Sequence, residues 1–114
     1  MSDGFVYHYT TAADWERSVA AGEHLVSGRG MTLQDHGFIH FCEQSQLAGV
    51  WHRFWTAETA PVMLLTVDKN ALPTPIVDEN TSGGTELFPH LYAPLPVAAV
   101  VDVQPVDADG RPQR

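Results

Sequence analysis

The sequence predicts a single α+β domain in which short strands are interrupted by two helices. Three observations lead to this fold class. The chain has 114 residues, 44% of them apolar, which suits one hydrophobic core. Strand-like stretches follow one another without the regular strand–helix alternation that builds a parallel sheet. No repeat or linker divides the chain, so we expect one domain over residues 1–106 and a polar, frayed C-terminal tail over residues 107–114.

Residues 5–10, "FVYHYT", are aromatic and β-branched, which predicts a first strand. Successive side chains of a strand point to opposite faces. One face carries Phe5, Tyr7 and Tyr9, and the other carries Val6, His8 and Thr10. A histidine therefore shares a face with residues that are expected to be buried.

The first helix is predicted in "TAADWERSVAAG". Thr11 is a suitable N-cap, and Asp14, three residues later, is the acid of a capping box. Gly22 is expected to end the helix. Trp15 and Val19 are one turn apart, and we expect both to share the buried stripe.

The middle of the chain is predicted to contain a loop, a short strand and the second helix. Residues 24–37 are expected to form a loop around short extended pieces, and residues 38–42, "FIHFC", a short apolar strand that carries His40. The second helix ends before Pro61. Its apolar residues follow the i, i+3, i+4, i+7, i+8 spacing of a core-facing stripe: Leu47, Val50, Trp51, Phe54 and Trp55.

Three further strands are predicted in the last part of the chain. Residues 62–67, "VMLLTV", are uniformly apolar and indicate a buried central strand. Residues 75–79, "PIVDE", are expected at a sheet edge because prolines surround them. Residues 80–85, "NTSGGT", indicate a flexible turn or lid, and residues 97–103, "VAAVVDV", a last strand.

Charge and composition narrow the classes of function. A net charge of −8 argues against nucleic acid as a partner, because phosphates are bound by cationic patches. Apolar runs are far shorter than the roughly 20 residues of a membrane helix. The start, "MSDGFVYHYT", lacks the pattern of a signal peptide, and the single Cys42 excludes an internal disulfide. We therefore expect a cytoplasmic protein, monomeric or weakly dimeric, that binds neither nucleic acid nor membrane.

Three of the six histidines, His8, His40 and His90, interrupt strongly apolar segments. A buried imidazole needs hydrogen-bond partners, since an unpaired polar group costs about 1–3 kcal/mol. The three rings either converge on one polar cleft or bond separate backbone carbonyls, and the sequence leaves both arrangements open. The other histidines are expected to be structural or surface groups: His24, His36 and His52.

Two rival uses of these residues are open. Three histidines from separate strands are able to bind zinc without any local sequence signature, although no metal is the leading expectation. Cys42 is a conceivable nucleophile with His40 or His90 as its base, but a cysteine in an apolar strand more often packs as a small hydrophobe.

Glu86 is the sharper acidic candidate. It follows the mobile "TSGGT" and precedes an apolar segment, which indicates a position near a pocket rim. A carboxylate there is able to bond a sugar hydroxyl and to oppose positive charge developing on a ribose carbon. The alternatives are a solvated glutamate or one that pairs with His90 to lock the turn.

The motifs "VYHYTTAADWE", "GFIHF" and "GGTELFPHLYAPLP" together resemble a bacterial family of small proteins classed as a domain of unknown function. The resemblance covers nearly the whole chain, from Val6 to about Val101. That family is grouped by fold with the ADP-ribosyltransferases. The resemblance therefore implies an ADP-ribosyltransferase-like split mixed sheet with two main helices, which binds NAD in a cleft between two small sheets.

The resemblance also implies roles by position. His8 would bond a ribose hydroxyl of NAD, the backbone at Tyr9 would hold the nicotinamide carboxamide, and His40 would flank the nicotinamide. Glu86 would engage the nicotinamide ribose and stabilise an oxocarbenium-like transition state. The catalytic candidates are Glu86, His40 and His90, and the cofactor-binding candidates are His8, Tyr9, Thr10, Tyr92 and Arg29.

The chain departs in three ways from the patterns of the transferases and of the family that it resembles. Tyr9 stands where the transferases usually have a glycine, and Ala93 replaces a glycine common in similar proteins. Only Arg29 and Arg53 are plausible partners for a pyrophosphate. The leading hypothesis is an NAD-binding protein with ADP-ribosyltransferase or NAD-glycohydrolase activity and an unknown acceptor. The alternatives are a non-catalytic module that binds a nucleotide-like ligand or a modified protein, and a histidine-based metal-dependent hydrolase.

Overall fold

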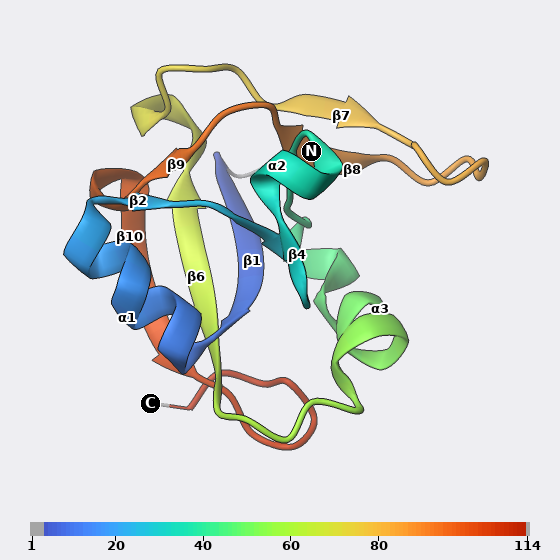
Figure 1. Ribbon diagram of the computed structural model, residues 1–114. Helices are drawn as coiled ribbons and strands as arrows, with labels where there is room; N and C mark the ends of the chain where they lie inside the picture. The colour runs from blue at the N-terminus through green and yellow to red at the C-terminus, as the bar shows by residue number, and fades with distance from the viewer. Residues whose placement is uncertain (1–3, 114) are drawn as a thin grey trace.

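The computed structural model describes residues 4–113, and its longest strands form a three-stranded antiparallel sheet (Figure 1). The strand order is β1 (Phe5–Thr11), β6 (Val62–Asp68) and β10 (Val100–Pro105). The central place of β6 confirms the prediction from its uniformly apolar sequence, since its side chains face packed residues on both sides.

A second three-stranded sheet has the order β5 (Ile39–His40), β8 (Phe88–Leu91) and β7 (Val77–Glu79). The two sheets meet where Tyr7 and Cys42 exchange backbone hydrogen bonds, each 2.9 Å long. The prediction of an edge strand at β7 is confirmed. These two three-stranded sheets are therefore joined at one corner.

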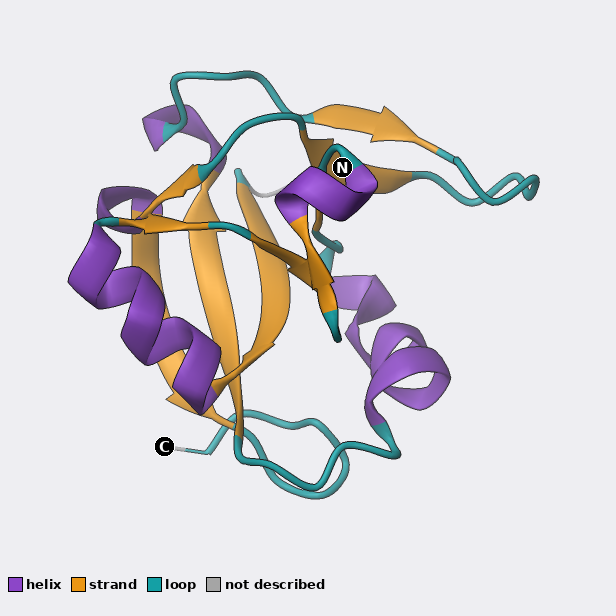
Figure 2. Ribbon diagram, in the orientation of Figure 1, coloured by secondary structure: helices purple, strands orange, loops and turns teal. Residues whose placement is uncertain are grey.

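Short elements complete the fold around these sheets (Figure 2). They are α1 (Ala12–Ala21), β2 (Glu23–His24), β3 (Val26–Gly28), β4 (Met31–Thr32), α2 (Leu33–His36), α3 (Leu47–Val50), β9 (Leu95–Pro96) and 3-10 turns at Gln44–Gln46, Lys69–Ala71 and Val97–Ala99. All strand pairings recorded within residues 4–113 are antiparallel, so the expectation of a mixed sheet is wrong. The coarser α+β class is confirmed.

Helix α1 begins and ends at the predicted residues, but only half of the predicted capping box is formed, because the Asp14 carboxylate bonds Arg17. The Asp14 amide donates to Thr11 Oγ1 over 3.1 Å, and Gly22 closes the helix in the left-handed conformation with φ of +83°. The buried stripe was predicted wrongly in one place, because the Val19 side chain is 53% exposed. Ser18 occupies the buried face instead, beside the half-buried Trp15.

The second helix is broken into a 3-10 turn, the short α3 and a π-helical turn at Trp51–Trp55. Trp51 and Trp55 are buried as predicted, with ring centroids 6.5 Å apart. Phe54 was predicted to be buried but is 52% exposed. A π-helical turn holds more residues than an α-helical turn, which rotates Phe54 off the tryptophan stripe.

The end of the chain is packed, so the expectation of a frayed tail is wrong for residues 107–113. Trp51 Nε1 donates to Ala108 O over 3.2 Å, and Tyr9 Oη donates to Gly110 O over 2.8 Å. These indole and phenol donors need buried acceptors, and the returning backbone supplies them. Arg114 and the first three residues of the predicted non-signal start lie outside the described residues.

Two hydrophobic clusters hold the molecule together on opposite faces of β1. The first comprises Val6, Ile39, Phe41, Leu65, Val67, Leu91, Leu95 and Ala99. The second comprises Tyr9, Trp51, Trp55, Val62 and Leu64. Among the described helices, none has the length and apolarity needed to cross a membrane.

Candidate functional site

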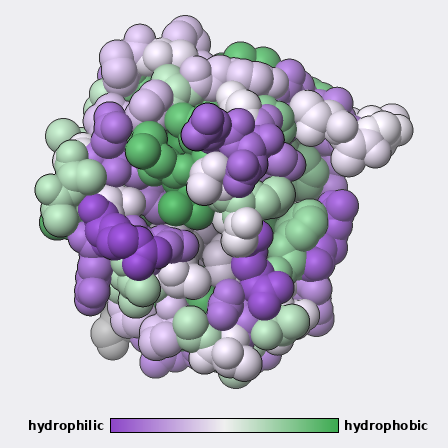
Figure 3. Space-filling view, in the orientation of Figure 1, coloured by the Kyte–Doolittle hydropathy of each residue, from purple (hydrophilic) through white to green (hydrophobic). Residues whose placement is uncertain are grey.

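A cavity of about 770 Å³ opens where the two sheets diverge. This volume lies in the range of about 300–1,000 Å³ that is common for small-molecule sites. Its walls come from β1, the β3–β4 hairpin, β5, the helical segment ending at Trp55, and β7 with the connection to β8. That connection projects from one edge of the molecule in the space-filling view (Figure 3).

Strand register places the chemical groups of the second sheet on one face. His40 and His90 are direct partners across β5 and β8, so their side chains share that face. Glu79 pairs with Phe88, two residues before His90, and lies on the same face. The opposite face carries Ile39 and Leu91, which are fully buried in the first hydrophobic cluster, as expected for a two-sided sheet.

Glu79 holds His90 and Tyr92 together. Glu79 Oε2 lies 2.9 Å from His90 Nδ1 and also accepts a hydrogen bond from the Tyr92 hydroxyl. The hydrogen bond from Tyr92, followed by the one from His90, lowers the pKa of the Glu79 carboxyl group. The carboxylate is therefore ionised at neutral pH, and it raises the pKa of Tyr92 in turn.

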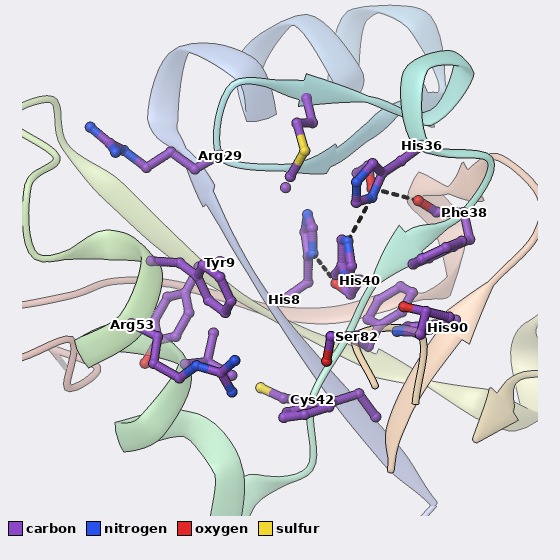
Figure 4. A pocket seen from close by; sticks show the side chains of 18 of the residues that line it. His8, Tyr9, Arg29, His36, Phe38, His40, Cys42, Arg53, Ser82 and His90 are labelled. Atoms are coloured by element: carbon purple, nitrogen blue, oxygen red, sulfur yellow. Dashed lines mark hydrogen bonds between the residues drawn. The ribbon is translucent and has the colours of Figure 1, made fainter. Parts of the chain in front are cut away.

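His40 and His36 form a second pair at the same end of the cavity (Figure 4). His40 Nε2 lies 2.8 Å from His36 Nδ1, and the His40 ring meets the His90 ring edge-on with centroids 5.2 Å apart. Burial, and then the neighbouring His90, His36 and His8 rings, lower the pKa of His40 to about 4. His40 is therefore a neutral imidazole at pH 7.

His8 is tied on both ring nitrogens. Its Nδ1 lies 2.6 Å from the His40 carbonyl oxygen, and its Nε2 lies 3.1 Å from His24 Nε2. His24 Nδ1 lies 2.6 Å from Ser18 Oγ. Because a carbonyl only accepts, His8 Nδ1 carries the hydrogen, and His24 Nε2–H then donates to His8. The single hydroxyl hydrogen of Ser18 is shared between two acceptors, His24 Nδ1 and the Asp14 carbonyl oxygen, which lies 3.0 Å from Ser18 Oγ.

This buried chain keeps both of its imidazoles neutral. Burial, and then the adjacent His24, lower the pKa of His8 to about 3, while burial lowers the pKa of His24 to about 4. The ribose contact that the resemblance implies for His8 therefore requires breaking one of its two bonds. In the present conformation His8 fastens β1 to β2 and β5.

The cationic groups lie on the other side of the cavity. Figure 4 shows Arg29 and Arg53 across the opening from Phe38 and His90. Arg29 Nε is 3.0 Å from Glu58 Oε1, and the Arg53 guanidinium lies 5.1 Å from the centroid of the exposed Phe54 ring. Both predicted partners for an anion thus border the same space.

Glu86, the predicted catalytic acid, lies outside this lining. Its Oε2 accepts a bond of 3.1 Å from Gln46 Nε2, and its backbone oxygen accepts one of 2.6 Å from Asn80 Nδ2. The pairing of Glu86 with His90 that the sequence left open is not formed, because the carboxylate at His90 Nδ1 is that of Glu79. The carboxylate that lines the cavity is Glu79.

The remaining predicted residues divide between the cavity and its surroundings. Tyr9 borders the cavity, but its ring packs on Trp51 at a centroid distance of 5.2 Å. Thr10 is fully buried away from the cavity, and within the described residues its Oγ1 has no hydrogen-bond partner. Tyr92 is not a lining residue, but it contacts the site through its bond to Glu79 and through its ring, whose centroid lies 5.2 Å from that of Phe38.

The two rival uses of the histidines gain no support from the geometry. Burial, and then the nearby Glu43, raise the pKa of the Cys42 thiol to about 12, so it is not a thiolate at neutral pH. Within residues 4–113, no group of three or more histidine, cysteine or acidic side chains is arranged to hold one metal ion.

Sequence reasoning missed three members of the histidine network. His24 and His36 were expected to be structural or surface groups, yet each contacts a histidine of the cavity. Glu79 was treated as part of an edge strand. The available signal was the spacing of Glu79 and Val77, two residues apart in "PIVDE", which puts both side chains on one face of the strand. That face is recognised as the His90 face only once the pairing of β7 with β8 is known.

Comparisons with known proteins place these features in one family. The family model described as "Protein of unknown function (DUF952)" matches residues 9–103. The crystal structure of protein CC0527 from Caulobacter crescentus is similar with a TM-score of 0.77 and 30% identity, covering 96% of this chain and 93% of that chain. The solution NMR structure of CC0527 has a TM-score of 0.71 and 33% identity, covering 96% and 92%. No curated protein matches the chain.

Proposed function

This chain belongs to the family of proteins of unknown function DUF952, and we propose from its own site that it binds NAD or a related ADP-ribosyl dinucleotide and cleaves the nicotinamide–ribose bond. One observation carries the proposal. A single cavity of about 770 Å³ has aromatic rings, neutral imidazoles and a carboxylate at one end and two arginines at the other.

The polarity of the cavity matches the order of groups in such a dinucleotide. We expect the Phe38 and His40 rings to contact the nicotinamide through their faces and edges. These two rings already make such a contact with each other, edge to face, with centroids 4.8 Å apart. Arg53 would contact the pyrophosphate, and Arg29 would join it by exchanging its bond to Glu58 for a phosphate oxygen. The exposed Phe54 ring would stack on the adenine.

Glu79 takes the chemical role that the sequence suggested for Glu86. Both of its recorded bonds end on Oε2, which leaves Oε1 for a ribose hydroxyl. An ionised carboxylate beside the ribose opposes the positive charge that grows on C1′ as nicotinamide departs with the bonding electron pair. The two divergent sheets with a cavity between them also support the grouping with the ADP-ribosyltransferase-like fold.

Calorimetry and nicotinamide release test this proposal together. We expect wild-type protein to bind NAD and ADP-ribose and to release nicotinamide, which chromatography quantifies. Glu79→Gln should retain binding and lose about 100-fold or more in release, as is common when one transition-state contact is removed. Glu16→Gln, on the exposed face of α1, is the matched control for loss of a carboxylate.

Glu86→Gln decides between the two carboxylates. If Glu86→Gln rather than Glu79→Gln abolishes release, the role returns to Glu86 and Glu79 is structural. A wild-type protein that neither binds nor consumes NAD or ADP-ribose would remove the proposal altogether.

A second candidate, binding without cleavage, is favoured by the state of His8. Both of its ring nitrogens are bonded within the protein, so the ribose contact implied by the resemblance is missing. Heat of binding to ADP-ribose without nicotinamide release from NAD over a long incubation would favour this candidate.

A further inference from the structure

His90 is held in one orientation from three sides. The Phe38 ring stacks on it with a centroid distance of 4.1 Å and an interplanar angle of 23°. The His40 ring approaches at 88° with a centroid distance of 5.2 Å. Glu79 Oε2 lies 2.9 Å from His90 Nδ1. The imidazole is therefore fixed both in plane and in rotation.

The partner of Nδ1 decides which nitrogen of His90 carries the hydrogen. Glu79 is ionised and only accepts, so His90 Nδ1 is the protonated nitrogen of the neutral ring. The Tyr92 hydroxyl donates to the same oxygen and steadies the carboxylate from the solvent side. His90 Nε2 is left with a lone pair.

That lone pair has no partner in the protein. Within residues 4–113, no recorded hydrogen bond ends on His90 Nε2. The buried polar atoms without a partner in this part of the chain are Thr10 Oγ1 and Gln104 Oε1. Nε2 is thus unbonded without being sealed in the interior, and His90 is a lining residue of the cavity.

The other histidines of the network lack this combination. His8 uses both ring nitrogens within the protein, and His40 Nε2 is engaged with His36. Among the described residues, His90 alone has one ring nitrogen on a carboxylate and the other unbonded at the cavity. This is the arrangement by which a carboxylate orients an imidazole as a base.

We infer that His90, oriented by Glu79, is the general base of this site and takes a proton from the water or hydroxyl group that attacks the ribose. This inference rests on the proposed function. The C1′–N1 bond breaks, and nicotinamide leaves with its electron pair. The oxygen nucleophile forms the new bond to C1′, and its proton passes to His90 Nε2. The imidazolium then returns that proton to solvent, so that NAD and water give ADP-ribose, nicotinamide and one proton.

The roles of the three side chains differ in this scheme. His90 contacts the nucleophile and is the catalytic residue. Tyr92 is a positioning residue that acts through Glu79. Glu79 has two roles, because its Oε2 orients His90 while its Oε1, on which neither of these bonds ends, would contact the ribose. The acceptor is accordingly an oxygen nucleophile, since a neutral imidazole is suited to removing a hydroxyl proton near neutral pH.

Histidine NMR tests the orientation without any ligand. Nitrogen-detected spectra of wild-type protein should show His90 as the Nδ1–H tautomer, with no hydrogen on Nε2. Glu79→Gln should weaken that preference or reverse it. A wild-type His90 that carries its hydrogen on Nε2 would overturn the inference, whatever the protein does with NAD.

Turnover supplies the second test. His90→Asn should keep the Kd for ADP-ribose within about threefold and lower nicotinamide release by about 100-fold or more, the usual share of a general base. The acid limb of the pH–rate profile should disappear with it. Tyr92→Phe, at an exposed position, should lose less than about tenfold and shift that limb. The exposed His52→Asn is the matched control.

The outcomes separate the two proposals. Wild-type protein that does not bind or cleave NAD, but shows the Nδ1–H tautomer, removes the proposed function and leaves the oriented base. Full release of nicotinamide by a folded His90→Asn protein, with an unchanged acid limb, removes the base and leaves the proposed function. If His90→Asn does not fold, the inference is tested by the His90 tautomer, which NMR compares between wild type, Glu79→Gln and Tyr92→Phe.

Discussion

The two faces of β1 satisfy their polar atoms in different ways. On the Tyr9 face, the phenol donates to Gly110 O and the Trp51 indole donates to Ala108 O, so each donor ends on a main-chain oxygen. On the His8 face, His8 Nδ1 also donates to a main-chain oxygen, that of His40, but the other bonds join imidazoles to one another and to a serine, and the network continues to the cavity. Polar groups that bond main-chain oxygens, such as the Tyr9 phenol, stabilise the fold. An imidazole with one unbonded ring nitrogen at the cavity, as in His90, is available to a ligand.

The aromatic side should therefore respond to truncation mainly through stability. Trp51→Ala removes a buried ring from the second cluster and a bond to Ala108, and we expect it to lower the free energy of unfolding by about 3–5 kcal/mol. Urea unfolding followed by circular dichroism measures the change.

Phe54→Ala is the matched control for the loss of Trp51, because its ring is 52% exposed at the cavity. It should change the free energy of unfolding by less than about 1 kcal/mol and weaken ADP-ribose binding instead. Equal losses of stability in both variants would mean that the π-helical turn does not separate core from cavity.

Local sequence patterns were sufficient to predict the elements whose ends or burial depend on residues close together in the sequence. Thr11 and Gly22 correctly predicted the two ends of α1, and the apolar run of β6 correctly predicted a central strand. The π-helical turn was invisible because an α-helical period was assumed, and Phe54 was misplaced as a result.

The site was only half predictable for a different reason. His8, His40 and His90 stood out because each interrupts an apolar segment, and all three border the cavity. Glu79 and His36 did not stand out, since polar residues in an edge strand and a short helix are ordinary. Their roles arise from the pairing of segments far apart in the chain, which no local pattern contains.

We expect acid to destabilise the protein through the buried histidines on the His8 face of β1. The pKa values of His8 and His24 are lowered to about 3 and about 4, mainly by burial, so the unfolded chain binds more protons than the native one below about pH 6.5. Stability then falls as pH falls, by about 1.4 kcal/mol per pH unit for each such proton and roughly 2–3 kcal/mol for the two.

Unfolding at a series of pH values, with His24→Gln beside wild type, checks this prediction. The variant lacks one of the three imidazoles whose pKa burial lowers, His8, His24 and His40, and should show about two thirds of the wild-type slope between about pH 5.5 and about pH 4.5. His52→Gln, at an exposed position, should retain the full slope. Identical slopes in all three proteins would show that the buried chain is not the acid-sensitive element.

The turn at the C-terminus should be the most sterically sensitive part of the aromatic side. A Cβ added at Gly110 would lie 2.4 Å from Trp51 Cδ2, and the φ of +77° at Gly110 is unfavourable for any other residue. We expect Gly110→Ala to lower the free energy of unfolding by about 1–3 kcal/mol, as overpacking does.

Gly83→Ala separates strain from contact in the Gly110 experiment. Gly83 also has a positive φ, +88°, but its Cβ would meet no atom within 4 Å. Its substitution carries the conformational penalty alone, so the difference between the two variants measures the contact with Trp51. Equal melting temperatures would show that the turn yields freely and that the tail is only loosely attached.

Tyr9→Phe should have the smallest effect on stability and the sharpest dependence on pH. It removes one buried hydrogen bond of 2.8 Å to Gly110 O, with a net loss of about 0.5–1.5 kcal/mol. Burial, and then Cys42 and Asp107, raise the pKa of Tyr9, so above about pH 10 the unfolded chain loses a proton that the native chain keeps. Wild-type stability then falls as pH rises, and Tyr9→Phe should remove part of that fall. Glu79 raises the pKa of Tyr92 as well, so Tyr92→Phe measures how much the phenol beside the cavity contributes to the loss of stability at high pH. If Tyr92→Phe reduces this loss and Tyr9→Phe does not, the phenol that makes the protein sensitive to alkali is Tyr92.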